Sequence, residues 1–338
     1  APLYPPMVLP PSALGLPLLP LAGAGVPYSF PLGFALPAGG PTKAALPHNT
    51  ELIDRYLGML QKEGVEVHNE LVEGITADDV LIIVDLQNDF VPPGSFGVEG
   101  CGSFGVAEGA STAGPIIQLI EKFAQAGASI VATRDYHPID HCSFKPQKGP
   151  FPPHCVQGTK GSFFCPPIKE ALEGARKKNK DGVHIVFKGW SSEVDSFGSF
   201  PYNEASATNR LACTHEAGLS CALKWTGCFQ LFCSNLENDL DAPPDVMSVL
   251  KMEDVTMQKI IGSKKRVFGV GLAMDFCVLD TCCNAQLLKP GFDEVYMVTD
   301  ACRPAYIPEV GEYDGFLQDP AFVKGKLEAS GVKLCTLG

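Results

Sequence analysis

Six short apolar runs, separated by stretches with helical spacing, constrain the fold of this chain more than any other feature. The runs are rich in Val, Ile and Leu and lie at 80–85, 129–134, 183–188, 267–272, 294–299 and 332–335. Strands that alternate with helices are typical of a parallel sheet with crossover helices. We therefore predict an α/β fold with a three-layer, doubly wound and mainly parallel sheet.

The predicted helices follow from apolar residues that recur with the 3.6-residue period of an amphipathic helix. They cover residues 51–62, 116–124, 168–178, 246–261, 277–289 and 322–329. Gly127 closes the second of them, and Pro290 with Gly291 stops the fifth, because these residue types end helices. Together the strands and helices predict one domain at 48–338.

The first 47 residues differ in composition from that domain. Segment 1–47 is apolar, rich in Pro and Gly, and carries no charge before Lys43. Prolines interrupt its apolar runs, so no stretch of about twenty residues can form a membrane helix, and it lacks the pattern of a signal or transit peptide. We predict an extended arm that lies along its own domain or along a neighbouring subunit, which favours a homo-oligomer.

Two insertions interrupt the predicted domain. One lies near 94–101, where the sequence GSFGV occurs twice, at Gly94–Val98 and at Gly102–Val106, which indicates a local duplication in a Gly-rich loop. The other covers 202–245, is rich in Cys and Asn, and has weak periodicity. We expect packing or subunit contact, rather than chemistry, from the second insertion.

Charge and cysteine content limit the class of partner and the compartment. The formal net charge is −12 and the isoelectric point is near 5.0, which argues against a nucleic-acid-binding surface and favours small-molecule substrates. Thirteen Cys without repeated CxxC spacing indicate reduced thiols rather than a disulfide framework. We therefore predict a cytoplasmic protein that binds neither nucleic acid nor membrane.

Polar side chains gather where the predicted strands end. These residues are Asp85, Asp135, His137, Lys188 and, just past the strand at 267–272, Cys277. In an open α/β sheet the carboxyl ends of the strands meet at one crevice, where ligands bind. The sequence thus predicts an acid, a lysine, a thiol and a pair of metal-ligating residues at one place.

Asp135, His137 and His154 have the character of a divalent metal site. Asp135 and His137 are two residues apart, so on an extended segment their side chains point the same way. One oxygen and two nitrogens leave positions open for water or substrate, as in catalytic sites, and His141 could add a fourth contact or support the ligands. Zinc is favoured, while iron or manganese also suits these ligands. The alternative is a set of ordinary surface-loop residues.

Cys277 is the candidate nucleophile, because a thiol at the start of a helix is expected to favour the thiolate. Its alternative is a small core residue, since free Cys is often buried. Lys188 ends an apolar strand, where it needs an anionic partner such as Asp85 unless its side chain extends to water. Asp85 is either a general base or a polar strand end that caps the next turn.

Five motifs in order carry a resemblance to a known family. They are VDLQNDF, RDYHPIDHCSF, PPHCVQGTKG, KGWSSEVDSFGSF and GLAMDFC. Over about residues 80–305, apart from the insertions, the chain resembles the nicotinamidase/pyrazinamidase branch of the isochorismatase-like cysteine hydrolases. The resemblance implies an isochorismatase-like fold for 48–338 and an amidohydrolase that converts nicotinamide to nicotinate and ammonia through a cysteine thioester, in NAD salvage.

The resemblance also assigns roles to individual residues. It implies a catalytic triad of Asp85, Lys188 and Cys277, and one divalent metal ion held by the three candidate ligands named above. It further implies a cis peptide between Leu272 and Ala273, with the N–H groups of Ala273 and Cys277 as an oxyanion hole. The aromatic residues that would bind the pyridine ring are Phe90, Phe151 and Phe276.

Two other functions remain open at this stage. One is a related cysteine amidohydrolase that acts on another small amide. The other is an assembly or structural protein built on this enzyme scaffold, with the arm and the insertions as contact surfaces.

Overall fold

The computed structural model describes residues 46–189, 192, 195–200, 231–233, 239–242, 264–287 and 292–337. Almost all of the predicted arm at 1–47, most of the insertion at 202–245 and the predicted helix at 246–261 lie outside the described residues. The arm, its part in a homo-oligomer and the domain boundary at 48 therefore stay predictions. In the described part of the chain, no helix has both the length and the apolar character needed to cross a bilayer.

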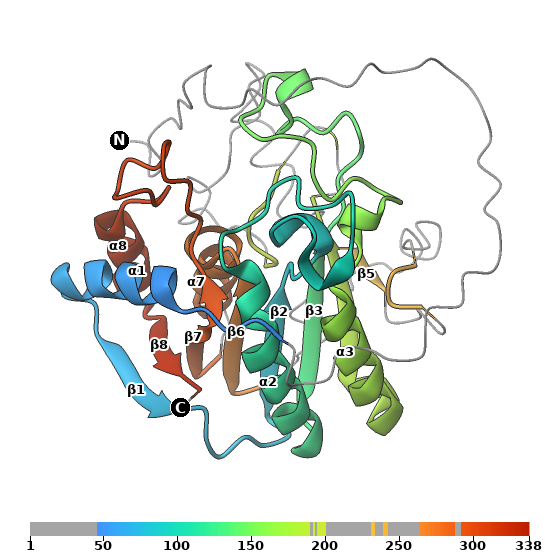
Figure 1. Ribbon diagram of the computed structural model, residues 1–338. Coiled ribbons are helices and arrows are strands. Elements are labelled where there is room, and N and C mark those ends of the chain that lie inside the picture. The colour runs from blue at the N-terminus through green and yellow to red at the C-terminus, as the bar shows by residue number, and fades with distance from the viewer. Residues whose placement is uncertain are drawn as a thin grey trace.

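The described residues form one sheet with the strand order β1-β8-β7-β6-β2-β3-β4-β5 (Figure 1). The strands are β1 (Val67–Leu71), β2 (Asp79–Val84), β3 (Ser129–Asp135), β4 (Val183–Lys188), β5 (Leu231–Cys233), β6 (Arg266–Leu272), β7 (Glu294–Arg303) and β8 (Lys333–Thr336). Neighbouring strands pair in parallel, except that β5 is antiparallel to β4. The predicted mainly parallel α/β sheet is confirmed, and all six predicted strands are present.

Two strands at the edges were not predicted. Residues 67–71 read VHNEL, in which three polar residues separate two apolar ones, and β5 has only three residues. Neither has the apolar run or the alternation by which a strand is recognised in sequence. Each forms because a neighbouring edge offers unpaired backbone groups: β1 pairs with β8, and β5 extends the sheet beyond β4.

The helices agree with the predicted positions, with one difference. They are α1 (Glu51–Lys62), α2 (Ala113–Gln125), α3 (Pro166–Lys178), α7 (Leu279–Gln286) and α8 (Pro320–Ser330). The helix predicted from Cys277 begins earlier, with the π-helical turn η9 (Met274–Val278), in which the N–H groups of Phe276 and Val278 both donate to the Ala273 carbonyl. Apolar spacing could not reveal this turn, because backbone hydrogen bonds define it.

The chain winds in two directions from the centre of the sheet. It runs from β2 through α2 to β3 and through α3 to β4, while from β6 it runs the opposite way through α7 to β7 and through α8 to β8. Figure 1 shows α2 and α3 in front of the sheet and α7 behind it, as right-handed crossovers require. The direction changes between β2 and β6, and ligands bind outside the strand ends at such a switch point.

The strands at this switch point are buried on both faces, which explains their continuous apolar sequences. Gly271, near the end of β6, has a φ of +115° and lies against the backbone of β2. A Cβ atom there would come within 2.0 Å of the Val84 carbonyl oxygen. The close approach of β6 to β2, which brings their ends together, therefore requires glycine.

Gly271→Ala should lower the free energy of unfolding by about 3 kcal/mol or more, because it combines an unfavourable φ with a backbone clash. Gly114→Ala is the control, since a Cβ at this position of α2 meets no described atom within 4 Å. That change should be neutral or stabilise by up to about 1 kcal/mol. Urea unfolding of both variants measures the difference, and equal midpoints would contradict this account of the switch point.

Candidate active site

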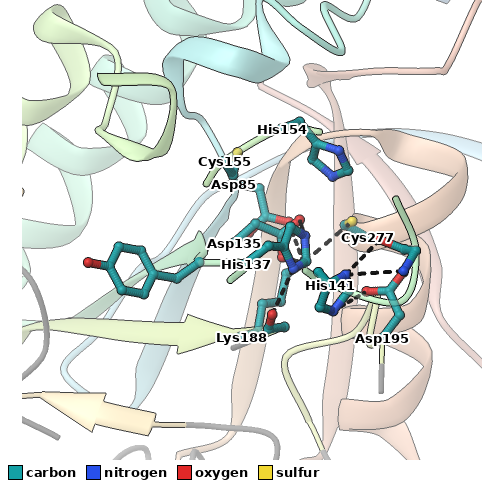
Figure 2. Close-up of polar contacts among 12 residues, drawn as sticks. Asp85, Asp135, His137, His141, His154, Cys155, Lys188, Asp195 and Cys277 are labelled. Atoms are coloured by element: carbon teal, nitrogen blue, oxygen red, sulfur yellow. Dashed lines mark hydrogen bonds and ion pairs between the residues drawn. The ribbon is translucent and has the colours of Figure 1, made fainter. Parts of the chain in front are cut away.

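Four strand ends bring an acid, a second acid, an ammonium and a thiol into contact (Figure 2). Lys188 Nζ, at the end of β4, lies 2.8 Å from Asp85 Oδ2 and 3.6 Å from Cys277 Sγ. It also forms an ion pair with Asp135, the last residue of β3. All four side chains are buried. The structure thus places the predicted triad in one cluster, although the residues are up to about two hundred positions apart in sequence.

Backbone and side-chain contacts hold the two carboxylates in place. Asp85 has a φ of +50°, and its N–H donates to Thr133 Oγ1 at 3.0 Å while the Thr133 hydroxyl donates to Asp85 Oδ1 at 2.7 Å. The Gln87 side chain, just past the end of β2, binds the backbone at the end of β3. Its carboxamide accepts a hydrogen bond from the Asp135 N–H and donates one to the Asp135 carbonyl, both at 2.8 Å. The end of β2 and the end of β3 are therefore locked together.

The charges of the cluster determine its resting protonation state. Burial opposes the charge on Lys188, but Asp135 and Asp85 outweigh it and hold the pKa of the ammonium well above its usual value. Burial likewise opposes ionisation of Asp135, yet Lys188 and His137 hold the pKa of that carboxyl below its usual range. For Asp85 burial prevails over the attraction of Lys188 and raises the pKa to about 6.

Cys277 does not behave as its position at a helix start suggested. Burial raises the pKa of the thiol well above its usual value; Lys188 opposes this rise, and the carboxylates of Asp85 and Asp135 add to it. These surroundings therefore oppose the thiolate that a helix start favours. Desolvation and two nearby negative charges act against a helix dipole, whose effect is confined to one turn. The sulfur needs a base that accepts its proton.

The three candidate metal ligands lie together beside this cluster. The ligand atoms of Asp135, His137 and His154 are all within 4.8 Å of one another. His137 Nδ1 is 2.7 Å from the Gly189 carbonyl oxygen, and His154 Nδ1 is 2.8 Å from the Pro152 carbonyl oxygen. A carbonyl requires the proton on Nδ1, which leaves Nε2 of each ring as the ligand atom.

The chemistry of this set of side chains fits a divalent ion. Burial, with a smaller contribution from His137, lowers the pKa of His154 to about 4, so its ring is the neutral ligand form at neutral pH. His141 does not belong to the trio with Asp135. Its ring is tilted against that of His137 with a centroid distance of 4.1 Å, it hydrogen-bonds Ser143, and its Nε2 lies 4.0 Å from Asp195 Oδ1, which indicates a supporting position.

A pocket opens on both clusters. It is lined by Phe90, Phe104, Val106, Asp135, His137, Phe151, His154, Asp195, Phe197, Ala273, Phe276 and Cys277. The three aromatic residues assigned from the family resemblance are all among them. The walls are thus mainly aromatic and apolar, while the polar groups converge at one side, as in sites for small planar ligands.

Sequence reasoning missed two aromatic side chains of this pocket. Phe104 stacks on His154 with a centroid distance of 5.5 Å and an interplanar angle of 30°, and its ring meets Phe151 edge-on at 5.3 Å. Phe197 contacts Phe276 at 5.4 Å. Phe104 belongs to the second GSFGV copy and Phe197 to the motif KGWSSEVDSFGSF, so the duplication and the motif are the sequence signals that could have revealed them.

The turn that carries Cys277 is anchored by Asp275. The peptide bond between Leu272 and Ala273 is cis, as the resemblance implied, and both Ala273 and Cys277 line the pocket. Asp275 Oδ1 accepts a hydrogen bond of 2.8 Å from the Ala305 N–H, while its Oδ2 is buried without a partner among the described residues. Burial prevails over these backbone contacts and raises the pKa of Asp275 to about 7.

Asp275→Asn should change how stability depends on pH. The usual pKa of Asp is 3.8, so as pH rises from 4 to 7 the unfolded chain ionises Asp275 while the folded protein keeps its proton, and the wild type loses stability. Asn cannot ionise. The free energy of unfolding of the variant relative to the wild type should therefore rise by about 2 to 3 kcal/mol between pH 5 and pH 8.

Urea unfolding of both proteins at these two pH values measures that difference. Asp314→Asn serves as the control, because the Asp314 side chain is 70% exposed. Its stability relative to the wild type should change by less than about 1 kcal/mol over the same interval. A flat difference for Asp275→Asn would mean that the buried carboxyl is ionised throughout.

Comparisons with known proteins point to one family. A family model described as the Isochorismatase domain matches residues 79–184, which hold Asp85 and the three candidate metal ligands. The nicotinamidase of Escherichia coli strain K12 is 27% identical over 263 residues, 76% of this chain and 94% of that protein. The nicotinamidase/pyrazinamidase of Mycobacterium tuberculosis strain H37Rv is 42% identical over 114 residues, 32% of this chain and 56% of that protein.

Among solved structures, the pyrazinamidase of Pyrococcus horikoshii in complex with zinc is 25% identical and gives a TM-score of 0.45. The match covers 77% of this chain and 99% of that one.

Proposed function

Because this chain belongs to the nicotinamidase/pyrazinamidase branch of the isochorismatase-like family, we propose that it hydrolyses nicotinamide to nicotinate and ammonia and thereby serves NAD salvage. Its relatives make it a hydrolase that acts on an amide bond. The observation that carries the proposal is the contact of Lys188 with both Asp85 and Cys277 at the wall of an aromatic pocket. A base, a cation and a nucleophile within hydrogen-bond reach form a catalytic triad.

In the proposed reaction the pocket first orients the substrate. Phe90, Phe151 and Phe276 offer apolar surfaces to a flat pyridine ring, which leaves the amide carbon facing Cys277. Orientation of this kind can supply about 7 to 11 kcal/mol of the barrier of a bimolecular reaction. A small aromatic amide is therefore the substrate class that this pocket favours.

Asp85 then accepts the proton of the Cys277 thiol as the sulfur attacks the amide carbon. Lys188 stabilises the negative charge that moves from the carboxylate to the sulfur, since its Nζ already lies between the two groups. The negative oxygen of the tetrahedral intermediate would accept hydrogen bonds from the N–H groups of Ala273 and Cys277, each worth about 3 to 4 kcal/mol.

The raised pKa of Asp85 suits both of its proton transfers. A carboxyl with a pKa of about 6 can accept the thiol proton and then donate it to the amide nitrogen, which leaves as ammonia. Loss of ammonia leaves a thioester on Cys277. Asp85, now ionised, takes a proton from a water molecule as the water oxygen attacks the thioester carbon. Asp85 then returns this proton to the departing sulfur, and the nicotinic acid that is released ionises to nicotinate.

We propose that Asp135, His137 and His154 hold one divalent ion, with zinc favoured and iron or manganese also suited to these ligands. When bound, the ion supplies a Lewis acid at the pocket wall that can ligate the ring nitrogen or a water molecule. Asp135 also contacts Lys188, so the same carboxylate links the metal site to the triad.

Cys277→Ala should abolish ammonia release from nicotinamide, a loss of about 10⁴-fold or more, because no thioester can form. Its metal content should stay that of the wild type. Cys283→Ala is the matched control, since Cys283 is a buried thiol in the adjoining helix and should be dispensable. An ammonia assay with elemental analysis tests both variants, and Cys277→Ala with wild-type turnover would refute the covalent route.

The same assay with other small amides decides between nicotinamide and the alternative amide substrates. A wild-type protein that releases ammonia from no amide would favour the assembly role.

Phe104→Ala should raise the Michaelis constant for nicotinamide by about 10-fold or more, because the pocket loses one aromatic wall. Phe96→Ala provides a control from the same sequence, GSFGV, in the first copy of the duplication. Phe96 packs against the core outside the residues that line the pocket, so its loss should leave the Michaelis constant within about 2-fold. Equal effects of both changes on the Michaelis constant would show that Phe104 does not contribute to binding.

A further inference from the structure

Asp89 takes no part in the proposed chemistry, yet its carboxylate is buried beside the pocket and joins two loops. It belongs to the short 3₁₀ turn η2 (Asn88–Phe90) that follows β2. Asp89 Oδ1 accepts hydrogen bonds from the N–H groups of Gly102 at 3.0 Å and Ser103 at 3.3 Å. Its Oδ2 accepts one from the Cys155 N–H at 2.9 Å.

The two loops held in this way carry adjoining parts of the pocket. Gly102 and Ser103 begin the second GSFGV copy, which delivers Phe104 to the pocket, while Cys155 directly follows the candidate ligand His154. The main chain continues the connection, since the Asp89 carbonyl accepts from the Phe104 N–H at 3.0 Å. The face-to-face contact of Phe104 with His154 lies where the two loops meet.

Gly161 makes room for this carboxylate. A Cβ atom at position 161 would come within 1.9 Å of Asp89 Oδ2. The residue lies in η6 (Lys160–Ser162), and glycine there lets the backbone lie directly against the carboxylate. An alanine at this position would displace the carboxylate without altering its charge.

Asp89 also distinguishes the two copies of the repeated sequence. Both copies form the same internal turn, in which the N–H of Gly97 or Gly105 donates to the carbonyl of Gly94 or Gly102. They differ at the last residue, since the Val98 N–H donates to Ser95 of its own copy and the Val106 N–H donates to the Phe90 carbonyl. Only in the second copy do the N–H groups of its first two residues reach the Asp89 carboxylate. Because the five residues are identical, the copies differ in what surrounds them rather than in local sequence.

We propose that Asp89 is a positioning residue that clamps the Phe104 loop to the His154 loop and so sets both the aromatic wall and the orientation of a metal ligand. The kinetic consequence rests on the proposed amide hydrolysis, whereas the clamp itself does not. Asn in place of Asp89 has one acceptor oxygen, and its amide group would face an N–H group, so at least one loop loses its bond.

Hydrogen exchange followed by mass spectrometry tests the clamp directly. In Asp89→Asn and in Gly161→Ala, peptides that cover 100–106 and 151–158 should both exchange about 10-fold faster than in the wild type. Asp79→Asn is the matched control for the first variant, because Asp79 is a buried carboxylate at the other end of β2 that accepts from the Thr76 N–H. Gly114→Ala is the control for the second. Neither control should accelerate exchange in these peptides.

Two further measurements separate positioning from a general loss of stability. Affinity for Zn²⁺, measured by competition with a chromophoric chelator, should fall by about 10-fold in both clamp variants and stay within about 2-fold in the controls. With nicotinamide, the clamp variants should show a higher Michaelis constant and a turnover number that changes less, because the triad residues keep their contacts.

Exchange that accelerates in one loop alone, or in neither, would overturn the clamp. The same holds if Zn²⁺ affinity and the Michaelis constant stay at wild-type values in both clamp variants. Should the wild type release no ammonia, the proposed function fails, while the exchange of the two loops still decides whether Asp89 joins them. Gly161→Ala decides the case if Asp89→Asn does not fold.

Discussion

The active-site region depends on one buried ammonium, that of Lys188. A charge at the end of an interior strand is costly unless it is paired, and here two carboxylates and a thiol from three other segments surround it. The pairing therefore ties the end of β4 to the ends of β2 and β3 and to the turn after β6. The parallel strand order and the close approach of β6 to β2 are what make these contacts possible.

The two carboxylates that share this ammonium acquire different properties from their other neighbours. Asp135 also faces His137, and its pKa stays low, as a metal ligand requires. Asp85 lies deeper, where burial dominates and raises its pKa to about 6, which suits a group that carries protons. Lys188 thus contacts one carboxyl whose pKa is lowered and one whose pKa is raised. Burial raises the pKa of the Cys277 thiol, which Lys188 also contacts.

Much of the fold and of the site could be predicted from local patterns. The six apolar runs predicted β2, β3, β4, β6, β7 and β8, because strands buried on both faces leave a continuous apolar signal. Residues at their ends, such as Asp85 and Lys188, could be assigned to one crevice by topology alone. The edge strands β1 and β5 escaped prediction, since pairing with a neighbour, and not their own composition, makes them strands.

Periodicity and residue order were thus sufficient for the class of fold and for the identity of the chemical groups at the strand ends. They could not show that Phe104 enters the pocket while Phe96 stays outside, because the two sit in identical five-residue sequences and differ in their surroundings, such as the contacts of the second copy with Asp89. Nor could they show that the Cys277 thiol is protonated. Its pKa follows from burial and from charges contributed by residues far away in the chain, which meet only when the sheet has formed.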